Sequence, residues 1–332
     1  MGIISKCVLL LLTLLFFSVP VFSSGVREDV SMTVIPIRVA GLKGPSGMGM
    51  AGMINSGTEI AAGYTVSFEI LGTPDIMVSK LLSGEVDAAA LPLNVAAKLY
   101  QKGAPYAMGA VTGYGSIYVV SSDPSIRTVA DLKGKIVYNA GRGATPDYLF
   151  QYILTQNGLS SRDYVTVNFS YEHAELAQLL IAGKADTAVL PEPFVTMVLA
   201  KNPKLRIALD LQKEWSALQK SADTYPVTAL VVKKSLAEEH AAFLKKLFAA
   251  YRESIGWVLQ NPQDAGKISE EMGLGLPAAV AADAVPRLNL AFIPAPEARK
   301  SAEAFLSVFL SFDPKSIGGK LPDEGFYINL GD

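Results

Sequence analysis

A twelve-residue pattern occurs twice in the chain and constrains its architecture more than any other feature. Leu81–Pro92 has the sequence LLSGEVDAAALP and Leu180–Pro191 has LIAGKADTAVLP, about one hundred residues further on, with six identical positions. Two copies are too few for a solenoid of stacked repeats, so they indicate a pair of similar lobes. The alternative interpretation is a common helix–turn–strand unit that the chain uses twice.

Each copy carries the same series of physical signals. An apolar helical run ends at a glycine, which accepts the positive φ that follows a helix. An aspartate suited to a turn comes next, and then a short apolar run that ends at a proline. This run is too short for a helix and predicts a buried parallel strand. The three residues are Gly84, Asp87 and Pro92 in the first copy, and Gly183, Asp186 and Pro191 in the second.

The ends of these strands predict where a ligand binds. In open α/β sheets, ligands bind beyond the carboxyl ends of the parallel strands. We therefore expect the ligand near Leu93-Asn94 in the first lobe and near Glu192-Pro193 in the second.

The first residues have the composition of a secretory signal. Lys6 precedes the apolar run Val8–Phe17, which is too short to span a bilayer, and Val21 and Ser23 suit a cleavage site. We expect residues 1–23 to be removed and the mature protein to be periplasmic or otherwise exported. The alternative is an uncleaved anchor.

The composition excludes several classes of function. The chain has 29 Lys+Arg against 31 Asp+Glu, so nothing indicates a nucleic-acid partner. Cys7 is the only cysteine and precedes the apolar run, so a lipoprotein cysteine, a disulfide, a thiol nucleophile and a thiolate metal site are not expected. With two histidines, a His-based zinc site is not expected either. We expect a monomer with no metal, cofactor or catalytic residue.

Glycine-rich turns that follow predicted strands supply the candidate ligand contacts. In the first lobe, Ser46 is expected to cap a short helix, and Thr73 caps the helix that begins the repeat. In the second, Thr145 is the expected cap, and the guanidinium of Arg142 beside free helix amides favours an anion. The aromatic ring of Tyr114 suits stacking on a ligand. The full set of expected contacts is Ser46, Gly47, Thr73, Asn94, Thr112, Tyr114, Asn139, Arg142, Gly143, Ala144, Thr145, Glu192 and Tyr225.

Strands alternate with helices along the whole chain, which predicts an α/β fold with mixed, parallel-rich sheets. The chain is expected to cross between the lobes twice, near Val119–Asp123 and near Tyr225–Val231. This assigns residues 32–121 and 227–332 to the first lobe and residues 122–226 to the second.

Several motifs together resemble the periplasmic substrate-binding proteins of ABC importers. They are GTPD before the first repeat helix, VADLKGKIV at Val129–Val137, GRGATPDY at Gly141–Tyr148 and LPEPF at Leu190–Phe194. The nearest group is the nitrate, sulfonate, taurine and thiamine-precursor type, which has the two-lobed class II periplasmic-binding fold. The resemblance implies that Thr145 and its neighbouring backbone hold ligand, with Ser46 and Gly47 in the first-lobe loop.

The resemblance has departures that leave the ligand open. The cysteine-rich motif of thiamine-precursor binders is absent, and we do not find the cleft histidine or further charged residues that are expected in nitrate or bicarbonate binders. The expected function is capture of a small polar ligand, anionic or zwitterionic, between two closing lobes, and its delivery to a membrane permease with its ATPase. The alternatives are a binder of a thiamine-precursor pyrimidine, a ligand-sensing subunit and an enzyme on the same fold.

Overall fold

The computed structural model describes residues 34–57, 59–140, 142–159, 165–220 and 224–331. The expected signal peptide, residues 1–23, lies outside the described residues. Within them, no helix combines the length and the apolar character needed to cross a membrane.

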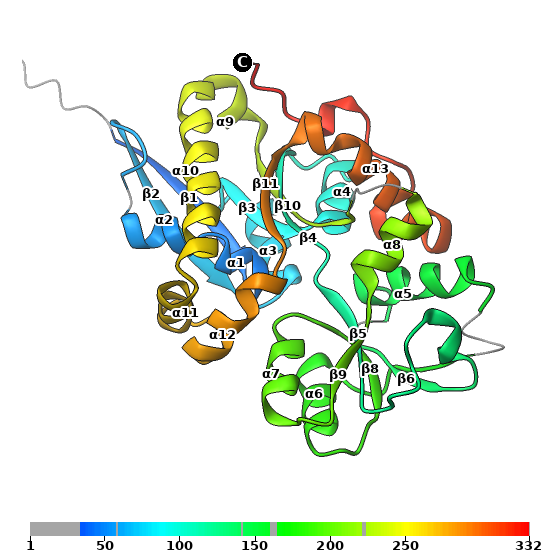
Figure 1. Ribbon diagram of the computed structural model, residues 1–332. Helices are drawn as coiled ribbons and strands as arrows, with labels where there is room; N and C mark the ends of the chain where they lie inside the picture. The colour runs from blue at the N-terminus through cyan, green and yellow to red at the C-terminus, as the bar shows by residue number, and fades with distance from the viewer. Residues whose placement is uncertain (1–33, 58, 141, 160–164, 221–223, 332) are drawn as a thin grey trace, which may run out of the picture. The chain divides into compact units, whose positions relative to one another are not determined.

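Six strands form the first sheet, in the order β11-β4-β10-β3-β1-β2 (Figure 1). β1 pairs in parallel with β2 and β3, while β10 runs antiparallel to β3 and β4. The strand bounds are β1 Ile35–Leu42, β2 Tyr64–Leu71, β3 Ala88–Pro92, β4 Tyr106–Tyr114, β10 Pro226–Lys233 and β11 Leu290–Pro294.

Five strands form the second sheet, in the order β7-β6-β8-β5-β9. β6 pairs in parallel with β7 and β8, while β5 runs antiparallel to β8 and β9. The bounds are β5 Ile117–Ser121, β6 Ile136–Tyr138, β7 Thr166–Asn168, β8 Thr187–Pro191 and β9 Arg206–Asp210. The α/β fold with mixed sheets is therefore confirmed.

One expected boundary is wrong. The strand Ile117–Ser121 was expected in the first lobe, but its ladder partners are β8 and β9 of the five-stranded sheet. The chain therefore passes from one sheet to the other at Gly115-Ser116, before this strand. An apolar strand pattern shows that a strand forms but does not show which sheet it joins, and this explains the error.

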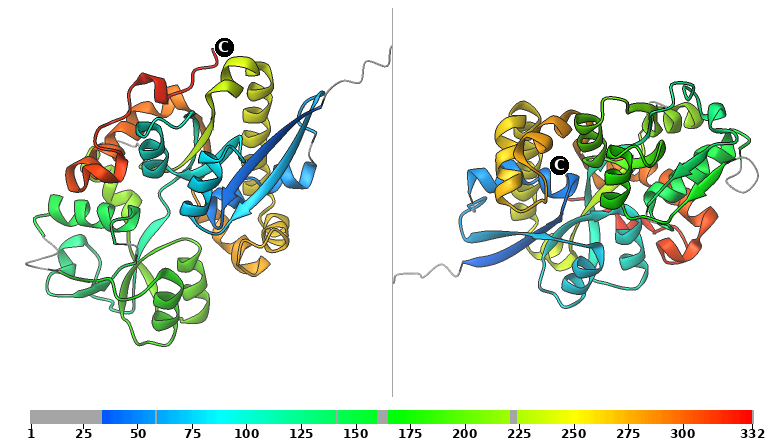
Figure 2. Two further views of the ribbon diagram at one scale, coloured as in Figure 1. Left: turned by 180° about the vertical axis from the view of Figure 1, so that it is seen from behind. Right: turned by 90° about the horizontal axis from the view of Figure 1, so that it is seen from below.

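Helices cover both faces of the six-stranded sheet (Figure 2). Alternate residues of each strand point to opposite faces, so Leu230 packs in one core and Val231 in the other. One face is covered by α2 Ala51–Ser56, α10 Ala241–Gln260, α11 Pro262–Glu271 and α12 Ala278–Ala284. The other face is covered by α3 Pro74–Leu82, α4 Leu93–Gln101 and α13 Ala295–Phe312.

The five-stranded sheet is covered in the same way. α6 His173–Ile181 and α7 Phe194–Lys201 pack on the face that carries Val120 and Leu190. α5 Thr145–Gln156 and α8 Leu211–Gln219 pack on the face that carries Val119 and Val189. The short elements are α1 Pro45–Met48, α9 Lys234–Glu239 and the 3₁₀ turns η1 Val129–Leu132, η2 Val285–Arg287, η3 Pro314–Ile317 and η4 Glu324–Phe326.

A cluster of aromatic rings joins the helices of the two sheets. The ring centroid of Trp215 on α8 lies 5.3 Å from Tyr152 on α5, 5.8 Å from Tyr225 and 5.5 Å from Phe305 on α13. Tyr225 stacks in turn on Phe305 at 5.2 Å. One apolar core therefore continues from the six-stranded sheet to the five-stranded sheet beside the crossing segments.

Both copies of the repeat form the expected helix, turn and strand. Gly84 has a φ of 76° and Gly183 a φ of 67°, so both occupy the left-handed region that favours glycine. The helix–strand pairs are α3 with β3 in the first copy and α6 with β8 in the second.

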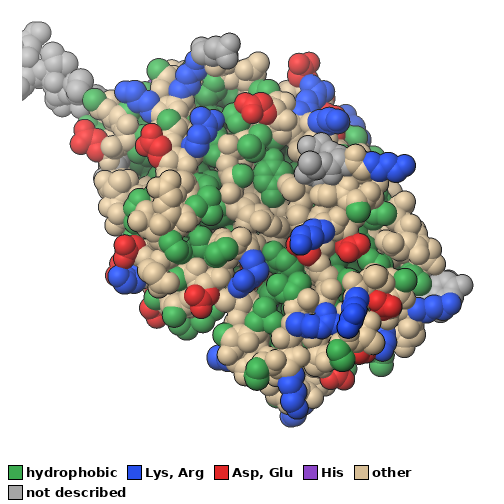
Figure 3. Space-filling view, in the orientation of Figure 1, with side chains coloured by type: hydrophobic (Ala, Val, Ile, Leu, Met, Phe, Trp, Pro, Cys, Tyr) green, Lys and Arg blue, Asp and Glu red, His purple; other side chains and the backbone are tan. Residues whose placement is uncertain are grey.

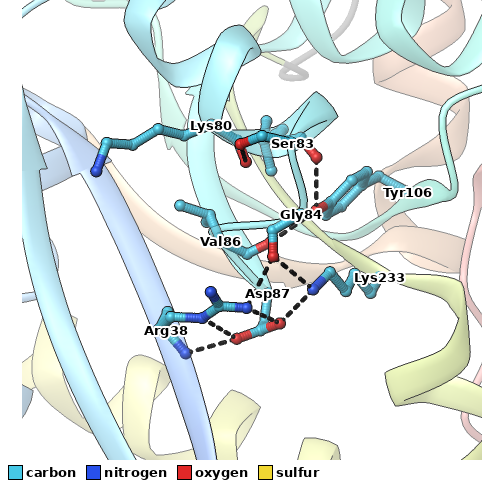
Figure 4. Close-up of polar contacts among 9 residues, drawn as sticks. Arg38, Lys80, Ser83, Gly84, Val86, Asp87, Tyr106 and Lys233 are labelled. Atoms are coloured by element: carbon cyan, nitrogen blue, oxygen red, sulfur yellow. Dashed lines mark hydrogen bonds and ion pairs between the residues drawn. The ribbon is translucent and has the colours of Figure 1, made fainter.

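The two repeat aspartates have different surroundings. The Asp87 carboxylate accepts hydrogen bonds from Arg38 Nε at 3.0 Å, Arg38 N at 2.9 Å and Lys233 Nζ at 2.5 Å (Figure 4). Burial acts to raise the pKa of Asp87, but the hydrogen bonds from Arg38 and Lys233 outweigh it and hold the pKa below its ordinary value. Asp186 is exposed and accepts a hydrogen bond from Ser122 Oγ at 3.1 Å. Only the first aspartate therefore ties together three strands, β1, β3 and β10.

Candidate functional site

A cavity of about 520 Å³ lies where the parallel strands of both sheets end. Leu42 at the end of β1, Pro92 at the end of β3 and Pro191 at the end of β8 all line it. The reversed strands β5 and β10 begin at the same place, where they contribute Ile117 and Val227. This is the position at which an α/β sheet presents a ligand site.

The starts of three helices form the wall on the side of the five-stranded sheet. α5 contributes Thr145 and the two residues before it, Gly143 and Ala144. α6 contributes His173, and α7 contributes Glu192, Pro193 and Phe194 around its start. Helix N-termini carry partial positive charge and free amide groups, so they favour a negatively charged or electron-rich ligand group.

The wall on the side of the six-stranded sheet comes from the turns that follow its strands. Lys43 and Ser46 follow β1, Asn94 and Val95 follow β3, and Tyr114 ends β4. Lys43 is exposed, which places its flexible ammonium group at the rim of the cavity.

Seven of the thirteen sequence-predicted contacts line the cavity and six do not. Those that line it are Ser46, Asn94, Tyr114, Gly143, Ala144, Thr145 and Glu192. Those that do not are Gly47, Thr73, Thr112, Asn139, Arg142 and Tyr225.

Three of these six residues support the local structure around the cavity. Gly47 is buried in α1, where a Cβ atom would lie 2.7 Å from the Leu42 carbonyl oxygen, so its small size serves packing. Thr73 is exposed and caps α3 by accepting a hydrogen bond from Ile76 N at 3.4 Å. Asn139 is buried and donates to the Pro146 carbonyl oxygen at 3.4 Å, which fixes the loop before α5.

The remaining three point elsewhere or are enclosed. The Arg142 guanidinium lies over the ring of Phe169, 4.4 Å from its centroid, and its side chain is exposed. Thr112 is buried within β4, and Tyr225 is enclosed in the aromatic cluster with Trp215.

Two expected helix caps are wrong. Gly44, not Ser46, is the N-cap of α1, and Ala144, not Thr145, is the N-cap of α5. The Ser46 hydroxyl instead donates to the Leu42 carbonyl oxygen at 3.3 Å. α1 begins one residue before Ser46 and α5 begins at Thr145 itself, so both residues lie inside their helices and neither side chain caps its helix. In α5 this leaves the Thr145 side chain inside the first turn and on the cavity wall.

Sequence reasoning missed His173 and Phe194, whose rings stack 5.7 Å apart on the cavity wall. The expectation that the cleft has no histidine is therefore wrong. Burial lowers the pKa of His173, and this effect outweighs the opposing contribution of the Glu172 charge. The lowered pKa favours the neutral imidazole. Its Nε2 is buried and has no hydrogen-bond partner among the described residues. The repeat could have indicated that His173 lines the cavity. His173 corresponds to Pro74 in the first copy, and Pro74 also lines the cavity.

The Glu192 carboxylate is fully buried and its charge is compensated. Its Oε1 accepts from Arg287 Nε at 2.5 Å and from Thr196 Oγ1 at 3.0 Å, and its Oε2 accepts from Thr196 N at 3.0 Å. Arg287 ends η2, just before β11 of the six-stranded sheet, and it does not line the cavity itself. The ion pair therefore joins elements of the two sheets.

The charged groups around the cavity favour an anion. Among the described residues, the Lys, Arg, His, Asp and Glu residues that line it are Lys43, His173 and Glu192. Because Arg287 compensates Glu192, the Lys43 ammonium is the uncompensated charge.

On the face drawn in Figure 3, side chains of both signs are interspersed, so neither sign dominates it. No group of His, Cys, Asp or Glu among the described residues is arranged to hold a metal ion.

Comparisons with known proteins agree with this geometry. Residues 55–284 match the family of phosphonate periplasmic substrate-binding proteins of ABC transporters. An ABC transporter structure from Parabacteroides distasonis is 30% identical, with a TM-score of 0.77 over 90% of this chain and 99% of that one. A search of the curated proteins finds no match.

Two more distant structures share the fold. The periplasmic aliphatic sulphonate binding protein from Escherichia coli is 19% identical, with a TM-score of 0.67 over 86% of this chain and 90% of that one. The periplasmic nitrate-binding protein from Synechocystis is 13% identical, with a TM-score of 0.60 over 88% of this chain and 87% of that one. The two-lobed periplasmic-binding fold is therefore confirmed.

Proposed function

The chain belongs to the family of phosphonate periplasmic substrate-binding proteins of ABC transporters, and we propose that it captures a small organic anion between two lobes and delivers it to a membrane permease. The proposed lobes follow the two sheets. Residues 34–115 and 226–331 form the first lobe, and residues 116–225 form the second.

The compensated charge of Glu192 is the observation that carries this proposal. Without Arg287, a buried carboxylate on the wall would repel an anion. With the 2.5 Å ion pair in place, the cavity presents the Lys43 ammonium, three helix starts and the His173 ring. These groups match a phosphonate or sulfonate head group, and Phe194, Val95 and Val227 supply apolar contacts for its organic part.

Ligand capture is proposed to work through closure of the lobes about the two crossing segments. Binding free energy is then used to close the cleft, so no bond is broken and no catalytic group is needed. The family and the expected signal peptide support export of this protein, and cleavage of that peptide predicts a mature protein that begins at Ser24.

The test is a binding screen with methylphosphonate, ethanesulfonate, nitrate and a pyrimidine, measured by calorimetry on the purified protein. We expect micromolar or tighter binding of an organic anion, and small-angle scattering should show compaction on saturation. Binding of the pyrimidine alone, or tight binding without compaction, would contradict the proposal. Uptake of the bound anion into proteoliposomes that contain the partner permease and ATPase would test delivery.

A further inference from the structure

We propose that Arg287, which lies outside the cavity, sets the charge preference of the site by compensating Glu192, so that the cavity selects an anion over its ammonium-bearing counterpart. This inference rests on the proposed function and specifies its ligand class. The charge that determines the ligand preference then belongs to Arg287, which does not line the cavity.

Glu192 carries an enclosed carboxylate within the cavity wall. Its side chain has no exposed surface, yet the residue lines the cavity. A carboxylate in such a position is the natural partner for a ligand ammonium group. Here, however, both oxygens already accept hydrogen bonds, from Arg287 and from the hydroxyl and amide of Thr196.

Arg287 is held in place by hydrogen bonds to three residues. Its Nε lies 2.5 Å from Glu192 Oε1, and its Nη2 donates to Thr196 Oγ1 at 2.5 Å and to the Asp283 carbonyl oxygen at 3.2 Å. These contacts hold the guanidinium in one place, although 32% of the side chain is exposed. The geometry therefore fixes a positive charge directly behind the cavity wall.

The Glu192 and Arg287 charges both act on a ligand in the cavity through electrostatic interaction. Charges in a partly buried site interact through a low effective dielectric constant, so one uncompensated charge near the ligand changes affinity by about tenfold or more. Removing Arg287 leaves the Glu192 charge uncompensated within the cavity wall, which opposes an anion and attracts an ammonium group. Removing the Glu192 charge leaves Arg287, which has the opposite effect.

The experiment uses pairs of probes that differ in an ammonium group. Methylphosphonate is compared with 2-aminoethylphosphonate, and ethanesulfonate with taurine, by calorimetry on the full mature chain. Wild type, Arg287→Met, Glu192→Gln and the double variant form a cycle. Arg299→Met is the matched control, because Arg299 also forms an ion pair, with Glu303 at 2.8 Å, but does not line the cavity.

We expect Arg287→Met to shift the ratio of anion to zwitterion affinity by at least about tenfold toward the zwitterion, and Glu192→Gln to shift it the other way. The double variant should lie near wild type, and Arg299→Met should not change the ratio. Because Arg287→Met leaves a buried unpaired carboxylate and can fail to fold, Glu192→Gln and the double variant decide the question in that case.

Two negative results remain distinguishable. If wild type binds none of the four probes, the proposed function fails. If wild type binds an anion and the ratio is the same in Glu192→Gln and in the double variant, Arg287 does not set the charge preference and this inference is overturned.

Discussion

Replacement of Asp87 by asparagine tests whether the repeat aspartate is structural. The carboxylate receives hydrogen bonds from two cations, Arg38 and Lys233, and its side chain is 11% exposed. Both cations also donate to the Gly84 carbonyl oxygen, so the cluster closes the turn of the repeat (Figure 4). Asp87→Asn keeps the shape of the side chain and removes its charge.

The size of the effect follows from how exposed the partners are. Breaking a fully buried ion pair by removing one partner costs about 3–5 kcal/mol. The side chains of Arg38 and Lys233 are 45% and 23% exposed, so both regain part of their hydration when the carboxylate is lost. We therefore expect Asp87→Asn to lower the free energy of unfolding by about 2–3 kcal/mol, with ligand affinity changed by less than about twofold.

Urea denaturation of Asp87→Asn measures this loss, and Asp186→Asn is the control that the repeat provides. Asp186 is exposed and accepts one hydrogen bond, from Ser122 Oγ, so its replacement should cost less than about 1 kcal/mol. An equal cost at both positions, or a larger loss of affinity than of stability for Asp87→Asn, would refute the structural role.

The pH dependence gives a second measurement of the same cluster. The pKa of Asp87 is lower in the folded state than in the unfolded chain, so the unfolded state binds more protons and stability rises with pH. The contribution is complete above the unfolded pKa of about 4 and is lost as pH falls through the folded pKa. The deficit of Asp87→Asn relative to wild type should therefore shrink below about pH 4.

Three further predictions concern the crossing, the loop before α5 and the cavity wall. Gly115→Ala should lower unfolding free energy by about 2–3 kcal/mol in urea, because its Cβ would overlap the buried ring of Tyr225, and an undiminished stability would contradict this packing. Arg142→Ala should change the ligand affinity measured by calorimetry by less than about twofold. Loss of the contact with Phe169 should lower the free energy of unfolding by about 0.5–1 kcal/mol. A tenfold loss of anion affinity would instead show that Arg142 contacts the ligand. The pKa of His173 is lowered on folding, so its contribution to stability is present above the unfolded pKa of about 6.5 and falls as pH drops through the folded pKa. His173→Asn should therefore flatten the melting temperature between pH 7.5 and 5.5 relative to wild type, and an unchanged slope would exclude this titration.

The repeat made the fold predictable because its signals are local. A glycine after a helix, an aspartate in a turn and an apolar run before a proline each act within a few residues, and both copies have the expected structure. The sheet to which Ile117–Ser121 belongs depends on partners far along the chain, which the local pattern does not contain.

The candidate site was predictable where it follows strand ends and not where it depends on side-chain partners. Asn94, Tyr114 and Thr145 line the cavity because they follow or end strands that point to it. The pairing of Glu192 with Arg287 joins residues 95 positions apart in the chain. No periodicity links them, so only the folded arrangement shows that the Glu192 charge is compensated.

The position of Trp215 gives the protein an internal optical reporter. Its indole packs against rings carried by α5, by the crossing segment and by α13, so its neighbours come from both sheets. Rotation of one sheet relative to the other changes the polarity and quenching that the indole experiences. The second tryptophan, Trp257, packs in the separate core beneath the six-stranded sheet. In a Trp257→Phe background, emission from a single native fluorophore would follow movement between the halves without an attached dye.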